Sequence, residues 1–133
     1  MSKVFLGGTC NKSNWREKII EYFREEGIEY FNPVVEDWTE ECMIEEIKQR
    51  KLCNFCLYGI TPKMTGGYSI AEVVDDSNKK PKQTILVLMK EDNGISFSDD
   101  QWKSLNSVAR MVENNGSLVF YSLKEAANTI ALL

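Results

Sequence analysis

A glycine-bearing segment, residues 58–72, ends in the carboxylate of Glu72 and holds the clearest candidates for chemistry. It follows an apolar run typical of a strand and leads into a pattern typical of a helix. Open α/β sheets bind ligands at this end of a strand, and a helix N-terminus favours an anionic ligand or an ionised carboxylate. Glu72 is therefore a candidate catalytic group. Ser69 and Glu72 also have the spacing of a capping box, which would make Glu72 ordinary helix surface.

The composition narrows the chemistry that these residues could do. The 133 residues include no histidine, so the commonest general base and metal ligand are absent. Cys53 and Cys56 have the spacing of a redox or zinc pair, but no second such pair accompanies them. We expect buried, reduced thiols here, and neither a metal nor a cofactor. Acid–base or nucleophilic work would fall to Asp, Glu, Cys, Tyr or Lys.

The charge pattern limits the partners. The net charge is −4 and no basic stripe is present, which argues against a nucleic-acid partner. No apolar run reaches the roughly 18 residues that would span a membrane, and no secretory signal is visible. We expect a cytoplasmic protein that binds a small molecule.

Strand and helix patterns alternate five times along the chain. Strand patterns occur at 4–6, 28–31, 55–58, 84–89 and 118–121, and helical patterns begin near residues 15, 39, 69, 98 and 122. Strict alternation predicts a parallel sheet covered by helices on both faces. We therefore predict one domain over residues 1–133, a flavodoxin-like three-layer α/β/α fold with a five-stranded parallel sheet in the order 2-1-3-4-5.

The loops after the first four strands would share one edge of this sheet. Gly7 and Gly8 directly follow a strand, where the absence of side chains permits close approach of a ligand to the backbone. They lack the third glycine of a dinucleotide fingerprint, and Gly66-Gly67 lacks the lysine of a P-loop. Each glycine pair could equally be a tight turn.

Three short motifs on this edge resemble the nucleoside 2-deoxyribosyltransferase family, especially its small, divergent branch. They are Lys3-Val-Phe-Leu-Gly-Gly-Thr9, Phe31-Asn-Pro33 with Asp37-Trp38, and Ile60-Thr-Pro-Lys-Met-Thr-Gly-Gly-Tyr-Ser-Ile-Ala-Glu72. The resemblance covers about residues 3 to 90. It implies a flavodoxin-like enzyme that cleaves the N-glycosidic bond of a nucleoside or nucleoside monophosphate through a glycosyl-enzyme intermediate, passing the sugar to another base or to water.

The resemblance also implies roles for individual residues. Glu72 matches the family nucleophile, and Glu46 matches a second acidic position on the preceding helix. Either Asp37 or Glu46 could protonate the leaving base, because glycosyl cleavage needs a proton donor beside the nucleophile. Substrate contacts are expected at Gly7, Gly8, Thr9, Asn32, Pro33, Trp38, Gly67, Tyr68 and Ser69. Family members are homo-oligomers, and we expect the C-terminal half, with Trp102, Met111 and Tyr121, to supply the contacts.

Two positions depart from the family pattern. Asn54 stands where an aspartate often begins the third strand, and Gly66 stands where many members carry an aspartate that acts on the leaving base. Three hypotheses follow: an N-glycosidase or deoxyribosyltransferase, a non-catalytic module that binds a nucleotide at the same edge, and an interaction domain without a small ligand. Glu46 could also be an ion-pair partner, and Asp37-Trp38 a turn with a packed indole.

Overall fold

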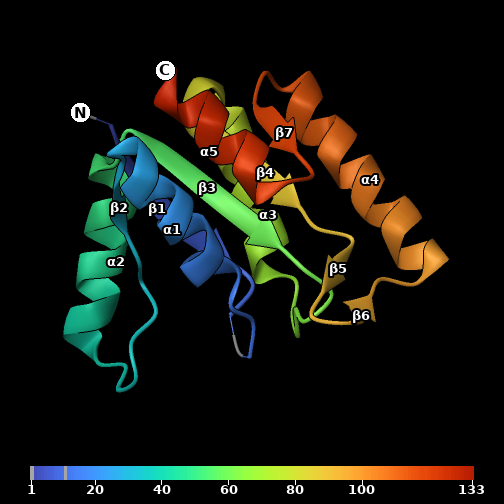
Figure 1. Cartoon of the computed structure of the whole chain (residues 1–133), viewed down its shortest axis with the longest axis horizontal. Helices are drawn as coiled ribbons and strands as arrows, with labels where there is room; N and C mark the ends of the chain where they lie inside the picture. Colours follow the sequence, from blue (N-terminus) through green and yellow to red (C-terminus); the bar gives the residue numbers. More distant parts are fainter. Residues whose placement is uncertain (1, 11) are drawn as a thin grey trace.

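The computed structural model describes residues 2–10 and 12–133, and a five-stranded parallel sheet forms its centre (Figure 1). The strands are β1 (Lys3–Gly8), β2 (Glu29–Phe31), β3 (Phe55–Ile60), β4 (Thr84–Leu88) and β7 (Leu118–Phe120). They lie in the order β2-β1-β3-β4-β7. Since β7 is the fifth strand of this sheet along the chain, the predicted order 2-1-3-4-5 and the flavodoxin-like fold class are confirmed.

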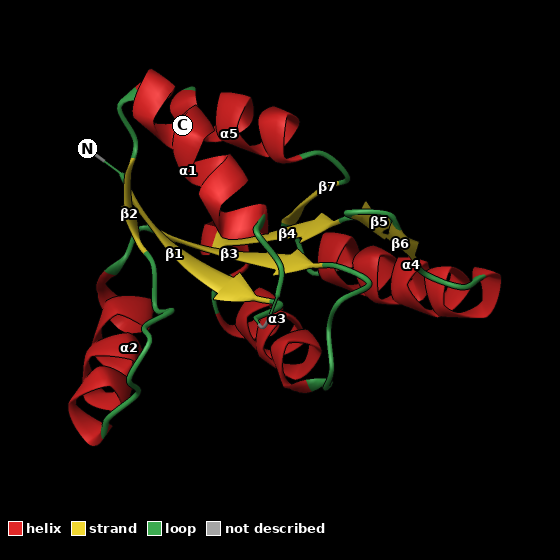
Figure 2. Cartoon of the chain, turned by 60° about the horizontal axis from the view of Figure 1, so that its bottom comes forward, coloured by secondary structure: helices red, strands yellow, loops and turns green. Residues whose placement is uncertain are grey.

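Helices cover both faces of the sheet (Figure 2). They are α1 (Trp15–Glu26), α2 (Glu40–Leu52), α3 (Tyr68–Lys79), α4 (Asp99–Asn114) and α5 (Leu123–Ala131), with a short 3-10 helix, η1 (Pro81–Gln83). Helices α1 and α5 pack on one face against Val4 and Leu6 of β1, whereas α3 and α4 pack on the other against Phe5. This alternation along β1 is the two-residue period of a strand buried on both faces.

Side-chain caps fix where several helices begin. Ser98 and Gln101 form a reciprocal capping box at α4, and Thr39 and Ser122 cap α2 and α5. The predicted start of α3 is wrong by two residues. Gly67, not Ser69, is its N-cap, so Glu72 lies beyond the first turn and is free of any capping role.

Helix α2 differs from the other helices in its burial. Among residues 40–52, all of which the structure describes, none is buried. Its apolar side chains point to solvent instead, with Ile44 63% and Ile47 51% exposed. In Figure 2 the helix stands beside the β2 edge, apart from the sheet. The helix predicted to begin near residue 39 is present, but the fold leaves its apolar side chains uncovered.

A two-stranded hairpin, β5 (Glu91–Asp92) and β6 (Ile95–Ser96), follows β4 and was not predicted. Its turn is Asn93-Gly94, and both residues have positive φ angles, 49° and 85°. Asn-Gly is the strongest short-range hairpin signal in a sequence. The strands escaped notice because each has two residues, too few for a visible alternation.

Candidate active site

The carboxyl ends of β1 and β3 are joined at the base of the candidate site. Gly8 lies opposite Gly59 in the sheet, and the Thr9 N–H donates to the Gly59 carbonyl oxygen at 2.8 Å. The Thr61 N–H in turn donates to Thr9 Oγ1 at 3.0 Å. A Cβ atom on Gly8, whose φ is +114°, would lie 2.1 Å from the Gly59 carbonyl oxygen. The contact between the strands therefore requires glycine at this position, in addition to any requirement of a ligand.

Arg16 supports the end of β1 and the loop that follows it through hydrogen bonds to the backbone. The side chain is almost completely buried, and its guanidinium donates to the carbonyl oxygens of Leu6, Gly8 and Thr9. It also lies 4.6 Å from the centre of the Trp15 ring. Burial lowers the pKa of Arg16, against the opposing influence of nearby Cys10 and Glu46. The group thus fixes the shape of the loop and brings a positive charge to the site.

Two adjoining cavities lie at this edge of the sheet. The larger, about 370 Å³, has the size of a small-molecule site. The smaller, about 160 Å³, lies beside it and shares Gly8, Cys10, Tyr68 and Ser69 with it. Eight of the predicted site residues line the larger cavity: Gly7, Gly8, Pro33, Trp38, Glu46, Tyr68, Ser69 and Glu72. Thr9 lines the smaller one.

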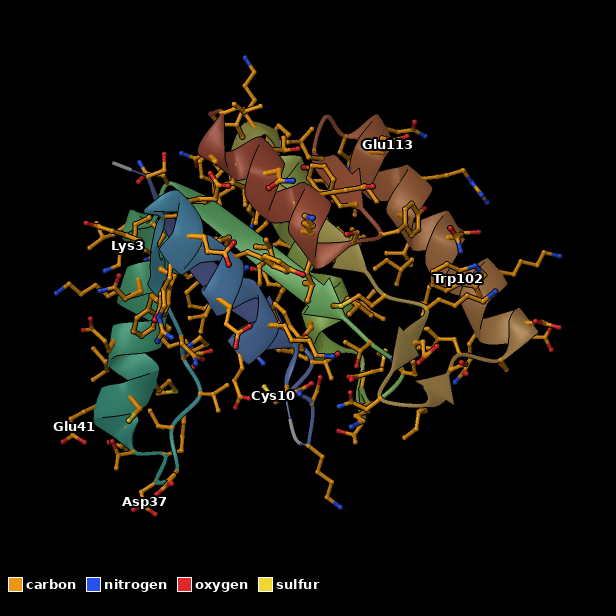
Figure 3. The ribbon with its side chains drawn as sticks, viewed as in Figure 1. Lys3, Cys10, Asp37, Glu41, Trp102 and Glu113 are labelled. Carbon is orange, nitrogen blue, oxygen red and sulfur yellow. The ribbon has the colours of Figure 1, made fainter. Side chains whose placement is uncertain are left out.

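Three predicted site residues lie elsewhere. In the described part of the chain, neither cavity is lined by Asn32, Asp37 or Gly67. The Asn32 side chain accepts the Val34 N–H at 3.1 Å and so shapes the loop behind Pro33. Figure 3 shows Asp37 at the tip of the loop before α2, far from Cys10 at the cavities. Of the two predicted proton donors, the fold brings Glu46 to Glu72 and leaves Asp37 outside.

The Glu72 carboxylate is partly shielded from solvent and faces charges of both signs. Its side chain is 19% exposed, and its Oε2 atom lies 3.4 Å from Arg50 Nη1. Burial raises the pKa of Glu72, the positive charge of Arg50 opposes that rise, and the negative charges of Glu46 and Asp76 add to it. Burial and Arg50 are thus the leading influences on the charge of Glu72, and the effect of the helix N-terminus stays a prediction.

The start of α3 faces the cavities without a side-chain cap. Within the described part of the chain, no side chain accepts the N–H groups of its first turn at the Gly67 N-cap. Tyr68 and Ser69, which open the helix, line both cavities. A helix start of this kind can bind a hydroxyl or an anion through its backbone.

The cysteines take no part in a disulfide. All four are free thiols; Cys53 and Cys56 are buried, as predicted, and Cys10 is exposed at the cavities. Across residues 2–10 and 12–133, no group of His, Cys, Asp and Glu side chains is arranged to hold a metal ion. None of the described helices is both long and apolar enough to cross a membrane.

Arg16 and Arg50 were missed by the sequence reasoning. Both lie in helical patterns rich in charged residues, where an arginine is normally solvated surface. Arg16 follows Trp15 at the buried start of α1, and that position was a usable signal. For Arg50 the signal was its position four residues after Glu46, which lines the larger cavity, because residues spaced in this way lie on the same side of a helix.

One comparison with known proteins identifies a family for this chain. The model of the family described as "Nucleoside 2-deoxyribosyltransferase like" matches residues 1–91, which include every residue that lines the two cavities. No curated protein matches the chain.

Proposed function

Because the chain belongs to the nucleoside 2-deoxyribosyltransferase-like family, we propose that it cleaves the N-glycosidic bond of a nucleoside or nucleoside monophosphate. Membership in this family points to chemistry at the glycosidic bond of a nucleoside. The observation that carries the proposal is the pairing of Glu72 and Glu46 on one cavity of suitable size. Two carboxyl groups beside the scissile bond are what glycosyl cleavage requires.

The reaction is proposed in two steps. In the first, Glu72 attacks the anomeric carbon, the bond from that carbon to the base nitrogen breaks, and the base leaves with the electron pair. Glu46 gives the leaving base a proton. In the second, water or another base attacks the same carbon, the ester to Glu72 breaks, and Glu46 takes the proton of the attacking group. Glu72 and Glu46 thereby return to their starting states.

The remaining lining residues suit the parts of such a substrate. Trp38 and Tyr68 are 59% and 77% exposed at the larger cavity, where their rings could stack on the base. The uncapped start of α3 could bind a 5′-hydroxyl or 5′-phosphate beside Ser69. The larger cavity thus combines aromatic rings, a helix start and two carboxylates, the groups that a nucleoside needs.

A panel of nucleosides and 5′-monophosphates, assayed for free base by chromatography, tests the proposal. Glu72→Gln should abolish base release and leave the circular dichroism spectrum unchanged. Asp75→Asn is the matched control, because it removes an exposed carboxylate of the same helix that pairs only with Lys79 among the described residues. A glycosyl adduct on Glu72, detected by mass spectrometry, would support the mechanism. Full turnover by Glu72→Gln would overturn it.

A non-catalytic nucleotide-binding module is the second candidate, and Gly66 favours it. No aspartate stands at that position, which lies at the smaller cavity. Asn54 bears less on this question, because it precedes β3 at the opposite end of the strand and accepts the Lys3 N–H at 2.8 Å. Tight nucleotide binding by calorimetry, with no base released on long incubation, would favour this candidate over the enzyme.

We also propose that the protein is a homo-oligomer, and that α2 supplies the contacts. Its Ile44 and Ile47 are exposed, as are Val34, Val35 and Trp38 of the preceding loop, at 47–59%. We propose that these side chains form one apolar patch of the kind found at interfaces. The first half of α2 is acidic and the second half basic. Two copies packed antiparallel would pair opposite charges around a two-fold axis. Met111 and Tyr121, expected at the contact, are also exposed but lie on other elements.

A further inference from the structure

A tyrosine–aspartate pair is buried directly behind Glu72. Tyr58 of β3 is fully buried and Asp76 of α3 is 4% exposed, within the apolar layer between the sheet and α3. The Tyr58 hydroxyl donates to Asp76 Oδ2 at 2.5 Å. A buried carboxylate is costly, and an apolar pair of similar volume often packs at least as well. The fold alone therefore gives little reason for a carboxylate at this place.

Arg50 of α2 connects this pair to Glu72. Its Nη2 donates to Asp76 Oδ1 at 2.7 Å, and its Nε donates to Asp76 Oδ2 at 3.3 Å and to the Tyr58 hydroxyl at 3.1 Å. The remaining Nη1 lies 3.4 Å from Glu72 Oε2. Glu72 and Asp76 are four residues apart on α3 and so share the face that α2 approaches. One guanidinium, held along its Nε–Nη2 edge, thus directs its Nη1 toward one oxygen of Glu72.

The other charges near Glu72 make Arg50 its principal counter-ion. Glu46 of α2 and Asp76 of its own helix raise the pKa of Glu72 and so disfavour its ionised form. Asp75 lies beside it but pairs with Lys79 on the surface.

Two more cations lie close by without replacing Arg50. Arg16 of α1 lines the same cavity, but its donors go to backbone carbonyls. Lys80 Nζ lies 4.0 Å from Asp76 Oδ2, and it donates to the Arg50 carbonyl oxygen and to Cys56 Sγ. Arg50 is thus the cation that forms an ion pair with Glu72 in the described structure.

We propose that Arg50 is a positioning residue for Glu72: its guanidinium, anchored by Asp76 and Tyr58, holds the Glu72 carboxylate in one orientation and in its charged form. This inference rests on the proposed role of Glu72 as nucleophile. When Glu72 becomes an ester it loses its negative charge, but Arg50 stays in place because Asp76 still binds it. The cation is then already positioned for the carboxylate that the second step releases, so little reorganisation is needed.

The test compares Arg50→Gln and Arg50→Lys with Lys51→Gln, a control that removes the neighbouring, exposed positive charge of α2. The first measurement is the pKa of the Glu72 carboxyl by carbon-detected NMR, with the resonance assigned by its absence in Glu72→Gln. In Arg50→Gln this pKa should rise by about 1 unit or more. Arg50→Lys should keep it near the parent value, and Lys51→Gln should leave it unchanged.

The second measurement is base release as a function of pH. In Arg50→Gln the acid limb of kcat/KM should move to higher pH, and kcat should fall by about 100-fold with KM little changed, because the carboxylate is no longer held. Arg50→Lys should lower kcat without moving the acid limb of the pH profile, because lysine keeps the positive charge but lacks the planar set of N–H donors of arginine. Tyr58→Phe, which loosens the anchor and keeps the ring, provides a second variant should Arg50→Gln fail to fold.

The outcomes separate this inference from the proposed function. A Glu72 pKa that is the same in parent, Arg50→Gln and Tyr58→Phe would overturn it, and a lower melting temperature alone would then mark Arg50 as purely structural. If Arg50→Gln shifts the Glu72 pKa but the parent protein releases no base from any substrate, the role of Arg50 toward Glu72 is supported and the proposed reaction is overturned.

Discussion

Replacing Gly8 with alanine should be one of the most destabilising single changes in this chain. Gly8 has a φ of +114°, a conformation that costs a residue with a side chain about 1–3 kcal/mol. The new methyl group would also lie 2.1 Å from the Gly59 carbonyl oxygen, and this backbone atom cannot rotate away as a side chain could. Overpacking of this kind costs about 1–3 kcal/mol more. We expect the free energy of unfolding to fall by about 4 kcal/mol in total.

Gly27→Ala separates the two costs. Gly27 also has a positive φ, +68°, but a Cβ atom there meets no neighbour within 4 Å. Only the conformational cost applies, about 1–2 kcal/mol. Urea unfolding followed by tryptophan fluorescence gives both free energies by linear extrapolation. The reasoning is refuted if Gly8→Ala loses no more stability than Gly27→Ala, since the strand ends would then have room to move apart.

Three further predictions test the site and its surroundings. Trp38→Ala should raise KM about tenfold with a smaller effect on kcat, because stacking on a base contributes about 1–3 kcal/mol; steady-state kinetics checks this. Ile44→Glu should give a monomer in sedimentation velocity where the parent protein sediments as a larger species, because it places a charge in the apolar patch. Burial raises the pKa of Glu72, so the native state binds the proton of the Glu72 carboxyl group more tightly than the unfolded chain does. The stability that this protonation contributes is lost as the pH rises through the raised pKa. Glu72→Gln, which lacks this titration, should therefore gain stability relative to the parent above about pH 4.3, the ordinary value for glutamate, and urea unfolding from pH 4 to 8 would show whether it does.

The fold was predictable because strand and helix patterns alternate without ambiguity. Continuous apolar runs such as Thr84–Leu88 can hardly be anything but central parallel strands, and every residue of that run is buried. The start of α3 was misplaced because Ser69 and Glu72 have an ideal capping spacing. The helix instead begins at Tyr68, with Gly67 as its N-cap, and glycine is among the residues that this position accepts well.

The candidate site was only partly predictable, because some of its groups depend on contacts between distant elements. The strand-end rule placed Gly8, Tyr68 and Glu72 around one cavity. No period in the sequence reveals that Arg50 reaches Asp76 across two helices, or that Tyr58, in an apolar strand, donates to that aspartate. Such networks form only once three elements have packed together.

The outer wall of the larger cavity belongs to a part of the chain with little burial of its own. Pro33 and Trp38 come from the loop before α2 and Glu46 from α2, where no residue in the described range 40–52 is buried. The ion pairs of Arg50 tie that helix to α3. Ion pairs fix a direction well but resist displacement less than a packed apolar face does. A second copy that covered Ile44 would therefore also hold Glu46 in place. Ile44→Glu, which should break the oligomer, should for this reason lower base release as well.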